Sequence, residues 1–285
     1  MPVAARNRPR EGAERVDAVD PVDGGAADAA NPTDHGRPGI EVINRAVDIL
    51  AAFARGAEMT LSLAEIARRT GLPKPTIHRL LAALDVVGLV VKTDHGYQLG
   101  IRLFELGEHV PRKQRLREAA LPFMQDLYEA SHDTVHLAVL DGLDVVYLER
   151  IRGHKVANIA SRVGGRLPAH STGVGKALLA HHPEVARRVM AAPMVPRTPY
   201  TITSPRLLAE ELERIRAAGI AYDREENSIG IKCAAAPILV DGVAVGAVSI
   251  TGPGLEVERY APAVKAAALG IRRTLMGAAP ARARP

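Results

Sequence analysis

The sequence SLAEIARRTGLPKPTIHRLL, residues 62–81, decides the fold of the first ordered part of this 285-residue chain. Ser62 and Glu65 form a Ser-x-x-Glu capping box, which predicts that a helix begins directly after the serine. Gly71 ends that short helix, because glycine readily adopts the left-handed conformation found at helix ends. Pro73 precedes a second helix, whose apolar residues recur at helical spacing. These apolar residues are Ile77, Leu80, Leu81 and Leu84.

The flanking residues complete a winged helix-turn-helix pattern. Apolar residues at three- to four-residue spacing predict an amphipathic helix from Ile40 to about Ala54. After Gly88, the apolar runs 89–92 and 97–99 flank a polar turn, which predicts a short β-hairpin. In this architecture the last helix enters the DNA major groove and the hairpin wing lies near the phosphate backbone.

The net charge of the whole chain, +5, does not itself mark a DNA-binding protein. Residues 40–110 are neutral overall, whereas residues 111–285 carry a net +7. The segment 66–84 nevertheless holds four basic side chains and no acid, beside the helix expected in the groove. An ordinary three-helix cluster with solvated polar residues is the alternative. The six candidate DNA-binding residues are Arg68, Arg69, Lys74, Thr76, His78 and Arg79.

The second half of the chain predicts a mixed α+β domain. Asp141-Gly142 and Asp241-Gly242 each separate two apolar runs, which is a strong signal for a tight β-hairpin. Helical patterns cover residues 116–131, 173–181, 207–218 and 260–276. Helices combined with a hairpin-built, largely antiparallel sheet are typical of sensor-like domains.

No catalytic set emerges from the sequence. His170–Ala177 resembles a phosphate-binding loop, but it lacks the leading glycine and the hydroxyl residue after its lysine. His132 precedes a β-patterned run and His136 lies within it, so the two would not share a helix face as the histidines of a zinc-protease helix do. Cys233 is the only cysteine and its default role is a small buried residue. We therefore predict no enzyme activity, no metal and no cofactor. The Gly-rich loop could still offer backbone amides to an anion, or it could be a tight turn before a buried helix.

The remaining segments set the expected location. Residues 1–39 and 278–285 have the composition of disordered tails, and the first of these lacks the apolar core of a secretory signal. No uncharged apolar stretch is long enough to span a membrane. With a single thiol, the chain is expected to be cytoplasmic.

The chain resembles IclR-type bacterial transcriptional regulators over roughly residues 40–276. The first half carries the resemblance through LAEIA at 63–67, GLPKPT at 71–76, HRLL at 78–81 and YQLG at 97–100. The second half does so in three further blocks. These are LPAHSTGVGKALLA at 167–180, GIAYDREE at 219–226 leading into GIKCAA at 230–235, and AVSITGP at 247–253.

This resemblance implies an organisation and a site. It implies a DNA-binding domain at 40–100, a linker and dimerisation helix at 101–115, and a GAF-like effector-binding domain at 116–277. The effector would be a small organic or aromatic acid. An ionised Asp223 would repel such an acid, so it would have to be protonated or bridged by water. The implied effector-binding residues are Val156, Ile159, Gly173, Val174, Asp223, Cys233, Ser249 and Thr251.

The resemblance also implies partners and a mechanism. The protein would bind double-stranded palindromic operators as a dimer or tetramer, and its effector would shift the arrangement of subunits. Two alternatives remain open at this point. One is a small-molecule enzyme with an accessory helical domain, and the other is a DNA-binding protein that responds to no ligand.

Overall fold

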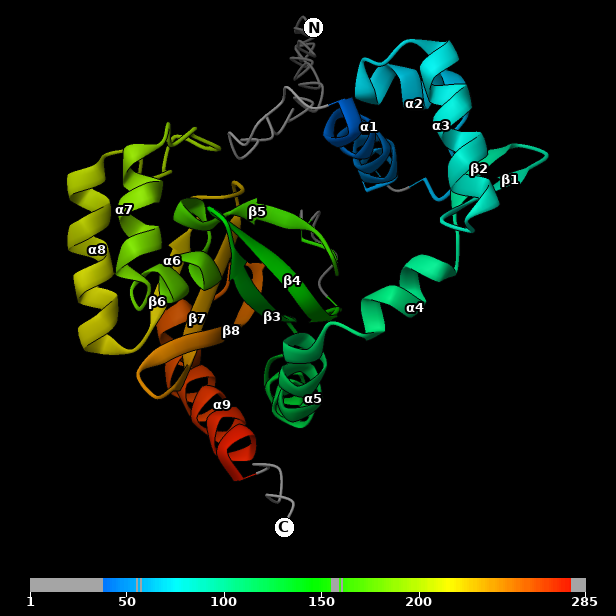
Figure 1. The fold of residues 1–285 in the computed structure, drawn as a ribbon. Helices are drawn as coiled ribbons and strands as arrows, with labels where there is room; N and C mark the ends of the chain where they lie inside the picture. Colours follow the sequence, from blue (N-terminus) through cyan, green and yellow to red (C-terminus); the bar gives the residue numbers. More distant parts are fainter. Residues whose placement is uncertain (1–37, 55, 57, 155–158, 160, 278–285) are drawn as a thin grey trace, which may run out of the picture. The chain divides into compact units, whose positions relative to one another are not determined.

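The computed structural model describes residues 38–277 except 55, 57, 155–158 and 160 (Figure 1). The predicted tails therefore lie outside the described residues, except that Pro38 and Gly39 already belong to helix α1 (Pro38–Ala52). The chain divides into two compact units within α1, and the second unit begins at Asp48. No helix among the described residues is long and apolar enough to cross a membrane.

The helix-turn-helix forms as the capping pattern predicts. Helix α2 (Leu63–Thr70) begins after Ser62, whose Oγ accepts a hydrogen bond from the Glu65 amide at 3.1 Å. Gly71 ends α2 with a φ of 69°, a left-handed conformation that costs little without a Cβ atom. Helix α3 (Lys74–Val86) then starts with a proline in its first turn.

The wing and the core of this region follow from the apolar pattern. Strands β1 (Val90–Thr93) and β2 (Gly96–Leu99) form an antiparallel hairpin, and Leu61 adds one bridge to Tyr97. Helices α1, α2 and α3 and strand β1 all contribute buried apolar side chains, whereas β2 contributes none. Leu80, predicted on the core face, is only half-buried. The core consists of Ile49, Ala52, Phe53, Leu61, Ile66, Ile77, Leu81, Leu84 and Val90.

The segment expected to be one linker helix, 101–115, contains parts of two helices. Helix α4 (Arg102–Glu108) ends before Val110, and α5 (Pro111–Ser131) begins at a proline. The residue before a proline disfavours helical geometry, and Val110 accordingly has extended φ and ψ of −82° and 97°. Three apolar side chains of this segment, Ile101, Phe104 and Leu106, are exposed by 57–71%.

A six-stranded antiparallel sheet organises the rest of the chain. Its strand order is β5-β4-β3-β8-β7-β6, so the two hairpins β3–β4 and β7–β8 lie side by side at the centre. Both Asp-Gly turns occur where predicted, and Asp241 and Gly242 both have positive φ. The strands are β3 (Thr134–Asp141), β4 (Asp144–Ile151), β5 (Arg166–Pro168), β6 (Ala221–Arg224), β7 (Ile231–Val240) and β8 (Val243–Pro253).

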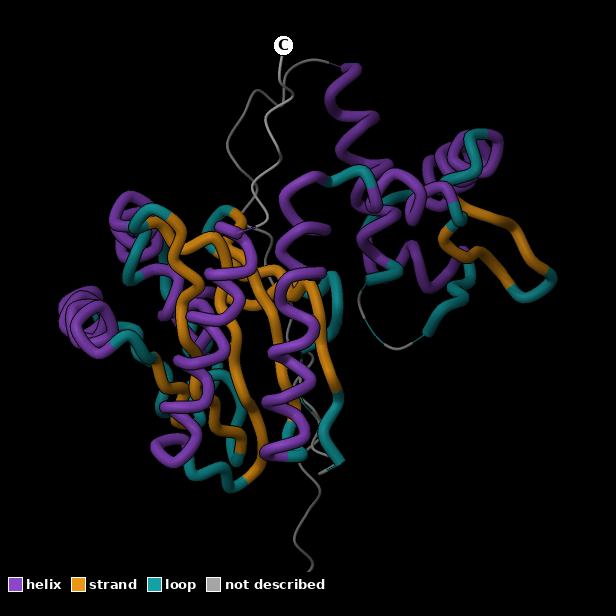
Figure 2. Tube along the Cα trace, turned by 90° about the horizontal axis from the view of Figure 1, so that it is seen from below, coloured by secondary structure: helices purple, strands orange, loops and turns teal. Residues whose placement is uncertain are grey.

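Helices cover both faces of this sheet (Figures 1 and 2). Helices α5 and α9 (Val257–Gly277) lie together on one face, where Met124, Val248 and Val264 belong to one apolar core. Helices α6 (Gly173–Leu179), α7 (Pro183–Ala191) and α8 (Pro205–Ala218) cover the other face and enclose a second apolar core. The sequence pattern predicted each of these helices except α7. The α6 face of the sheet carries a polar cavity.

Candidate functional site

Sheet register brings distant polar residues together on the α6 face. Asp223 on β6 pairs with Cys233 on β7, and Cys233 pairs with Thr251 on β8. One step along the same face, Ser249 pairs with His136 on β3. Directly paired residues of antiparallel strands point to the same side of a sheet, so these side chains form one polar surface facing α6.

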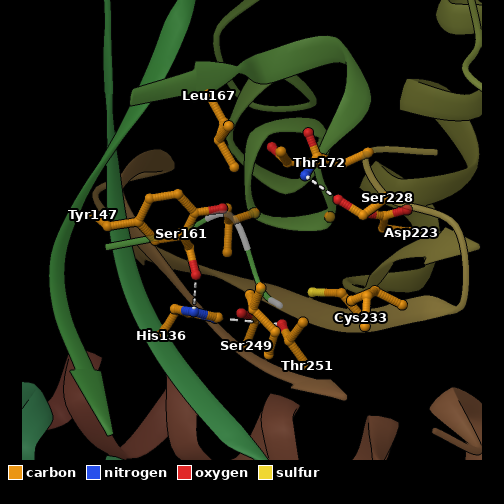
Figure 3. Close-up of a pocket in the computed structure, with 15 residues that line it drawn as sticks. His136, Tyr147, Ser161, Leu167, Thr172, Asp223, Ser228, Cys233, Ser249 and Thr251 are labelled. Carbon is orange, nitrogen blue, oxygen red and sulfur yellow. Dashed lines mark hydrogen bonds between the residues drawn. The ribbon is translucent and has the colours of Figure 1, made fainter. Parts of the chain in front are cut away.

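These residues line a partly open cavity of about 30 Å³, which is room for about two water molecules (Figure 3). The strands supply its floor and the start of α6 supplies its roof. The lining residues are His136, Tyr147, Ile159, Ser161, Leu167, Thr172, Gly173, Val174, Asp223, Asn227, Ser228, Ile231, Cys233, Ser249 and Thr251. A wider groove near the hairpin turns, about 920 Å³, contains none of the predicted site residues.

His136 is held as a neutral imidazole. Burial, reinforced by the nearby positive charge of Arg150, lowers the pKa of His136 to about 3. Its Nε2 lies 2.6 Å from Ser161 Oγ and its Nδ1 lies 3.3 Å from Thr251 Oγ1. The ring also packs against Tyr147, with centroids 5.0 Å apart. The imidazole therefore orders two hydroxyl groups at the cavity wall and brings no charge.

Two other lining groups are also neutral at ordinary pH. Burial raises the pKa of the Cys233 thiol to about 12, and the charge of Asp223 adds to this effect. Burial likewise raises the pKa of Tyr147 well above its ordinary value. A thiol held in this form is a poor nucleophile.

Asp223 is the carboxyl group of the cavity. Its side chain is buried, and Oδ1 accepts a hydrogen bond from the Glu226 amide at 2.7 Å. Burial, and then the negative charge of Glu226, raise the pKa of Asp223 to about 7. Asp223 therefore changes its charge near neutral pH, unlike the other lining groups considered above.

The Gly-rich loop is a tightly packed turn before a buried helix. Thr172 caps α6, because its Oγ1 accepts a hydrogen bond from the Gly175 amide at 3.1 Å. A Cβ at Gly173 would lie 2.9 Å from Cys233 Sγ, and a Cβ at Gly175 would overlap the Ala169 carbonyl oxygen. Every residue of α6 is buried. The glycines are therefore required for close packing, and the loop runs directly along the cavity.

A cluster of buried charged side chains lies next to the cavity. Lys176 on α6 is fully buried, and its Nζ lies 2.5 Å from Glu226 Oε1 and 3.4 Å from Glu211 Oε1. Glu211 also binds Arg214, at 2.6 Å. Glu226 Oε2 is buried and has no hydrogen-bond partner among the described residues. The single lysine is thus shared between two carboxylates.

Seven of the eight predicted effector-binding residues line this one cavity. The eighth, Val156, lies outside the described residues. Sequence reasoning missed the polar residues that complete the wall, His136, Tyr147, Ser161, Thr172, Asn227 and Ser228, together with Leu167 and Ile231. Two-residue spacing could have linked His136 to the face of Ala138, but not to Ser249, which lies in another hairpin. No cluster of three or more His, Cys, Asp or Glu able to hold a metal occurs among the residues described.

The predicted DNA-binding residues divide into two groups. Lys74, His78 and Arg79 are exposed on α3, and Thr76 is half-buried there. Arg68 is exposed by 65% at its side chain but also binds Glu65, at 2.7 Å. An exposed pair of this kind is weak, so a phosphate group could compete for Arg68.

Arg69 serves the internal packing of the helices. Its side chain is only 8% exposed, and it binds Glu58 at 2.8 Å and Glu65 at 2.6 Å. It also donates to the Ala52 carbonyl at 3.1 Å. Hydrogen bonds from Arg68 and Arg69 lower the pKa of Glu65 to about 2. Arg69 therefore ties Ala52, the last residue of α1, to α2, and its side chain is not available for DNA.

A winged helix-turn-helix followed by an α+β domain with a polar cavity defines the class of DNA-binding regulators that carry a sensor domain. Two family models place this chain within that class. The IclR helix-turn-helix domain matches residues 42–94, and the bacterial transcriptional regulator IclR C-terminal domain matches residues 109–273. The chain belongs to the IclR family of bacterial transcriptional regulators.

Individual relatives agree with this assignment. The HTH-type transcriptional regulator BhcR of Paracoccus denitrificans is 36% identical over 77% of this chain and 80% of its own. The transcriptional repressor IclR of Escherichia coli is 30% identical over 75% of this chain and 80% of its own. Both are named as transcriptional regulators, and this chain is accordingly a regulator and not an enzyme.

Solved structures give the same fold. An IclR homolog from Microbacterium hydrocarbonoxydans, complexed with 4-hydroxybenzoate, has a TM-score of 0.76 and 32% identity, covering 83% of this chain and 100% of its own. The IclR of Thermotoga maritima has a TM-score of 0.66 and 32% identity, covering 83% of this chain and 99% of its own.

Proposed function

We propose that this regulator binds a palindromic operator through α3, and that a small organic or aromatic acid in the polar cavity changes its affinity for that operator. The cavity carries the proposal, since it encloses seven of the residues expected at an effector site. Action on DNA in the cytoplasm accords with the described residues, which include no membrane-spanning helix.

The lining groups suit a small polar acid. Thr172 Oγ1 accepts the hydrogen bond from the Gly175 amide. The two residues before Gly175, Gly173 and Val174, line the cavity, and their backbone amides would donate to a bound acid. Ser249 Oγ is buried, and among the described residues it has the weakly bonding Cys233 thiol beside it but no nitrogen or oxygen partner. Such a hydroxyl can form a stronger hydrogen bond with a ligand or water. Ile159, Val174 and Leu167 provide the apolar surface on which the body of an acid would pack.

The similar IclR homolog from Microbacterium hydrocarbonoxydans is complexed with 4-hydroxybenzoate, which supports an aromatic acid as the first effector to test. A ligand of that size exceeds the present cavity of about 30 Å³. Drug-sized ligand pockets measure roughly 300–1,000 Å³, so we expect the walls to move apart when an effector binds. The domain would then have two states, and the effector would shift the population towards the state that it binds more tightly.

The DNA contacts follow from exposure on α3. Lys74, His78 and Arg79 can reach phosphates or base edges, while Ile77 and Leu81 anchor the helix in the core. Thr76 and Arg68 are secondary candidates.

Self-association would match the two-fold symmetry of a palindrome. The exposed apolar side chains of Ile101, Phe104 and Leu106 would be covered in a dimer or tetramer. Phe104→Asp should therefore reduce the molecular mass measured by light scattering. An unchanged mass would remove this surface from the proposed interface.

A thermal-shift screen of small organic acids tests the effector. 4-Hydroxybenzoate is the first probe, and each acid that raises the melting temperature is added to an operator-binding assay. Ser249→Ala should weaken the response to such an acid, because it removes a buried hydroxyl from the cavity wall. Thr203→Ala is the matched control, since it deletes an exposed hydroxyl of the same half of the chain. If the regulator binds no ligand, no acid will change its melting temperature.

A further inference from the structure

The cavity presents an electrostatic problem to an anion. Among its described lining residues there is no lysine or arginine, and the imidazole of His136 is neutral. The charged group that does line it, Asp223, is an acid. An ionised Asp223, 5% exposed, would repel a bound carboxylate strongly because little water screens the two charges.

The nearest buried cation cannot remove this repulsion. Lys176 Nζ is committed to Glu226 at 2.5 Å and to Glu211 at 3.4 Å. Among the described residues, Asp223 has no cation at ion-pair distance; its carboxyl accepts hydrogen bonds from the backbone amides of Glu226, at 2.7 Å, and of Asn227. The charge of Lys176 also acts on Asp223, but it lowers the pKa of that carboxyl less than burial and the charge of Glu226 raise it. The titratable and charged groups that face Asp223 are Lys176 on α6, Glu226 after β6, Cys233 on β7, Tyr147 on β4 and His136 on β3. The cluster therefore holds more carboxylates than its one lysine can neutralise.

We propose that the cavity binds its carboxylate effector together with one proton, which Asp223 holds and donates as a hydrogen bond to the ligand. This inference rests on the proposed function. The proton comes from solvent and forms an O–H bond on Asp223, while the ligand stays a carboxylate and none of its bonds breaks. Ligand charge −1 and proton charge +1 then enter together, so the buried site gains no net charge.

Proton uptake should depend on pH in a defined direction. With a pKa of about 7 in the free protein, Asp223 is largely protonated at pH 6 and largely ionised at pH 8. Binding should thus take up about 0.1 proton at pH 6 and about 0.9 proton at pH 8, and the affinity should fall roughly tenfold between these values.

Calorimetric titration of the full chain with 4-hydroxybenzoate tests this directly. Titrations at pH 6 and pH 8, each in two buffers of different ionisation enthalpy, count the protons taken up per ligand. Asp223→Asn keeps the acceptor for the Glu226 amide and supplies a fixed donor, so it should bind without proton uptake and with equal affinity at both pH values. Asp241→Asn, in an exposed hairpin turn, is the matched control and should behave like the parent protein.

The outcomes separate this inference from the proposed function. Binding at pH 8 with no proton uptake by the parent protein would overturn the proton-coupled site and leave an acid effector standing. If 4-hydroxybenzoate, benzoate and pyruvate all fail to bind at pH 6, where Asp223 is already neutral, both proposals fail together.

Discussion

Replacing Lys176 with methionine should destabilise the effector-binding half of the chain severely. Methionine has a similar length and fits the buried path of the lysine, but it removes the ammonium group that binds Glu226 among the described residues. Glu226 is itself 6% exposed, so its carboxylate would remain buried without a counter-ion. Breaking a buried pair by removing one partner costs about 3–5 kcal/mol, and we expect a loss in this range for Lys176→Met.

Removing the stranded charge should recover most of this loss. Lys176→Met combined with Glu226→Gln leaves no uncompensated ion, and replacement of both members of a buried pair is often nearly neutral. The coupling energy between the two substitutions should accordingly be at least about 2 kcal/mol. Glu184→Gln, at an exposed ion pair with Arg187, serves as the control and should change stability by less than about 0.5 kcal/mol.

Urea unfolding provides the assay. The chain has no tryptophan, so far-ultraviolet circular dichroism follows both halves, while thiol labelling of Cys233 reports the effector-binding half alone. This cysteine is buried and the only one present, so it reacts when its surroundings open. A loss below 1 kcal/mol for Lys176→Met would refute the claim that this lysine neutralises a buried carboxylate.

Three further outcomes follow from the contacts. Gly175→Ala should prevent correct packing of α6, because its Cβ would overlap the Ala169 carbonyl oxygen, and circular dichroism should show a lower melting temperature. Arg69→Ala should cost about 1–3 kcal/mol in urea unfolding, whereas Arg68→Ala, at an exposed pair, should cost less than about 0.5 kcal/mol. Asp223→Asn should stabilise the protein at pH 8 by up to about 4 kcal/mol. The native pKa near 7 exceeds the ordinary 3.8, so ionisation penalises the folded state as pH rises through this window, and the advantage of the variant should vanish below about pH 4.

Local chemistry explains which features could be predicted from sequence. The Ser62 capping box and the Asp-Gly turn at residues 141–142 act within a few residues, and each occurs where expected. The prediction of one linker helix over residues 101–115 was wrong, because a proline at residue 111 starts a second helix within this segment. Helix α7 was missed, although His182-Pro183 resembles the start of a helix.

The polar wall of the cavity depends on contacts that sequence spacing does not encode. His136 meets Ser249 only because β3 pairs with β8, and this pairing joins the two hairpins. Similarly, an acid-free stretch of sequence does not reveal that Arg69 binds Glu58, which lies before it in the chain. The family resemblance supplied seven cavity residues for this reason: it carried information on register that a single sequence lacks.

Operator binding with and without an effector tests the central claim most directly. The upstream DNA is titrated with the parent protein, Arg79→Ala and the control Arg206→Ala, an exposed arginine on α8, in the presence and absence of the best acid from the thermal-shift screen. We predict that Arg79→Ala weakens binding more than tenfold without unfolding the protein, that Arg206→Ala does not, and that the acid changes the dissociation constant of the parent protein. Unchanged binding by Arg79→Ala would contradict the groove assignment, and an acid that binds the protein but leaves operator affinity unchanged would contradict effector control.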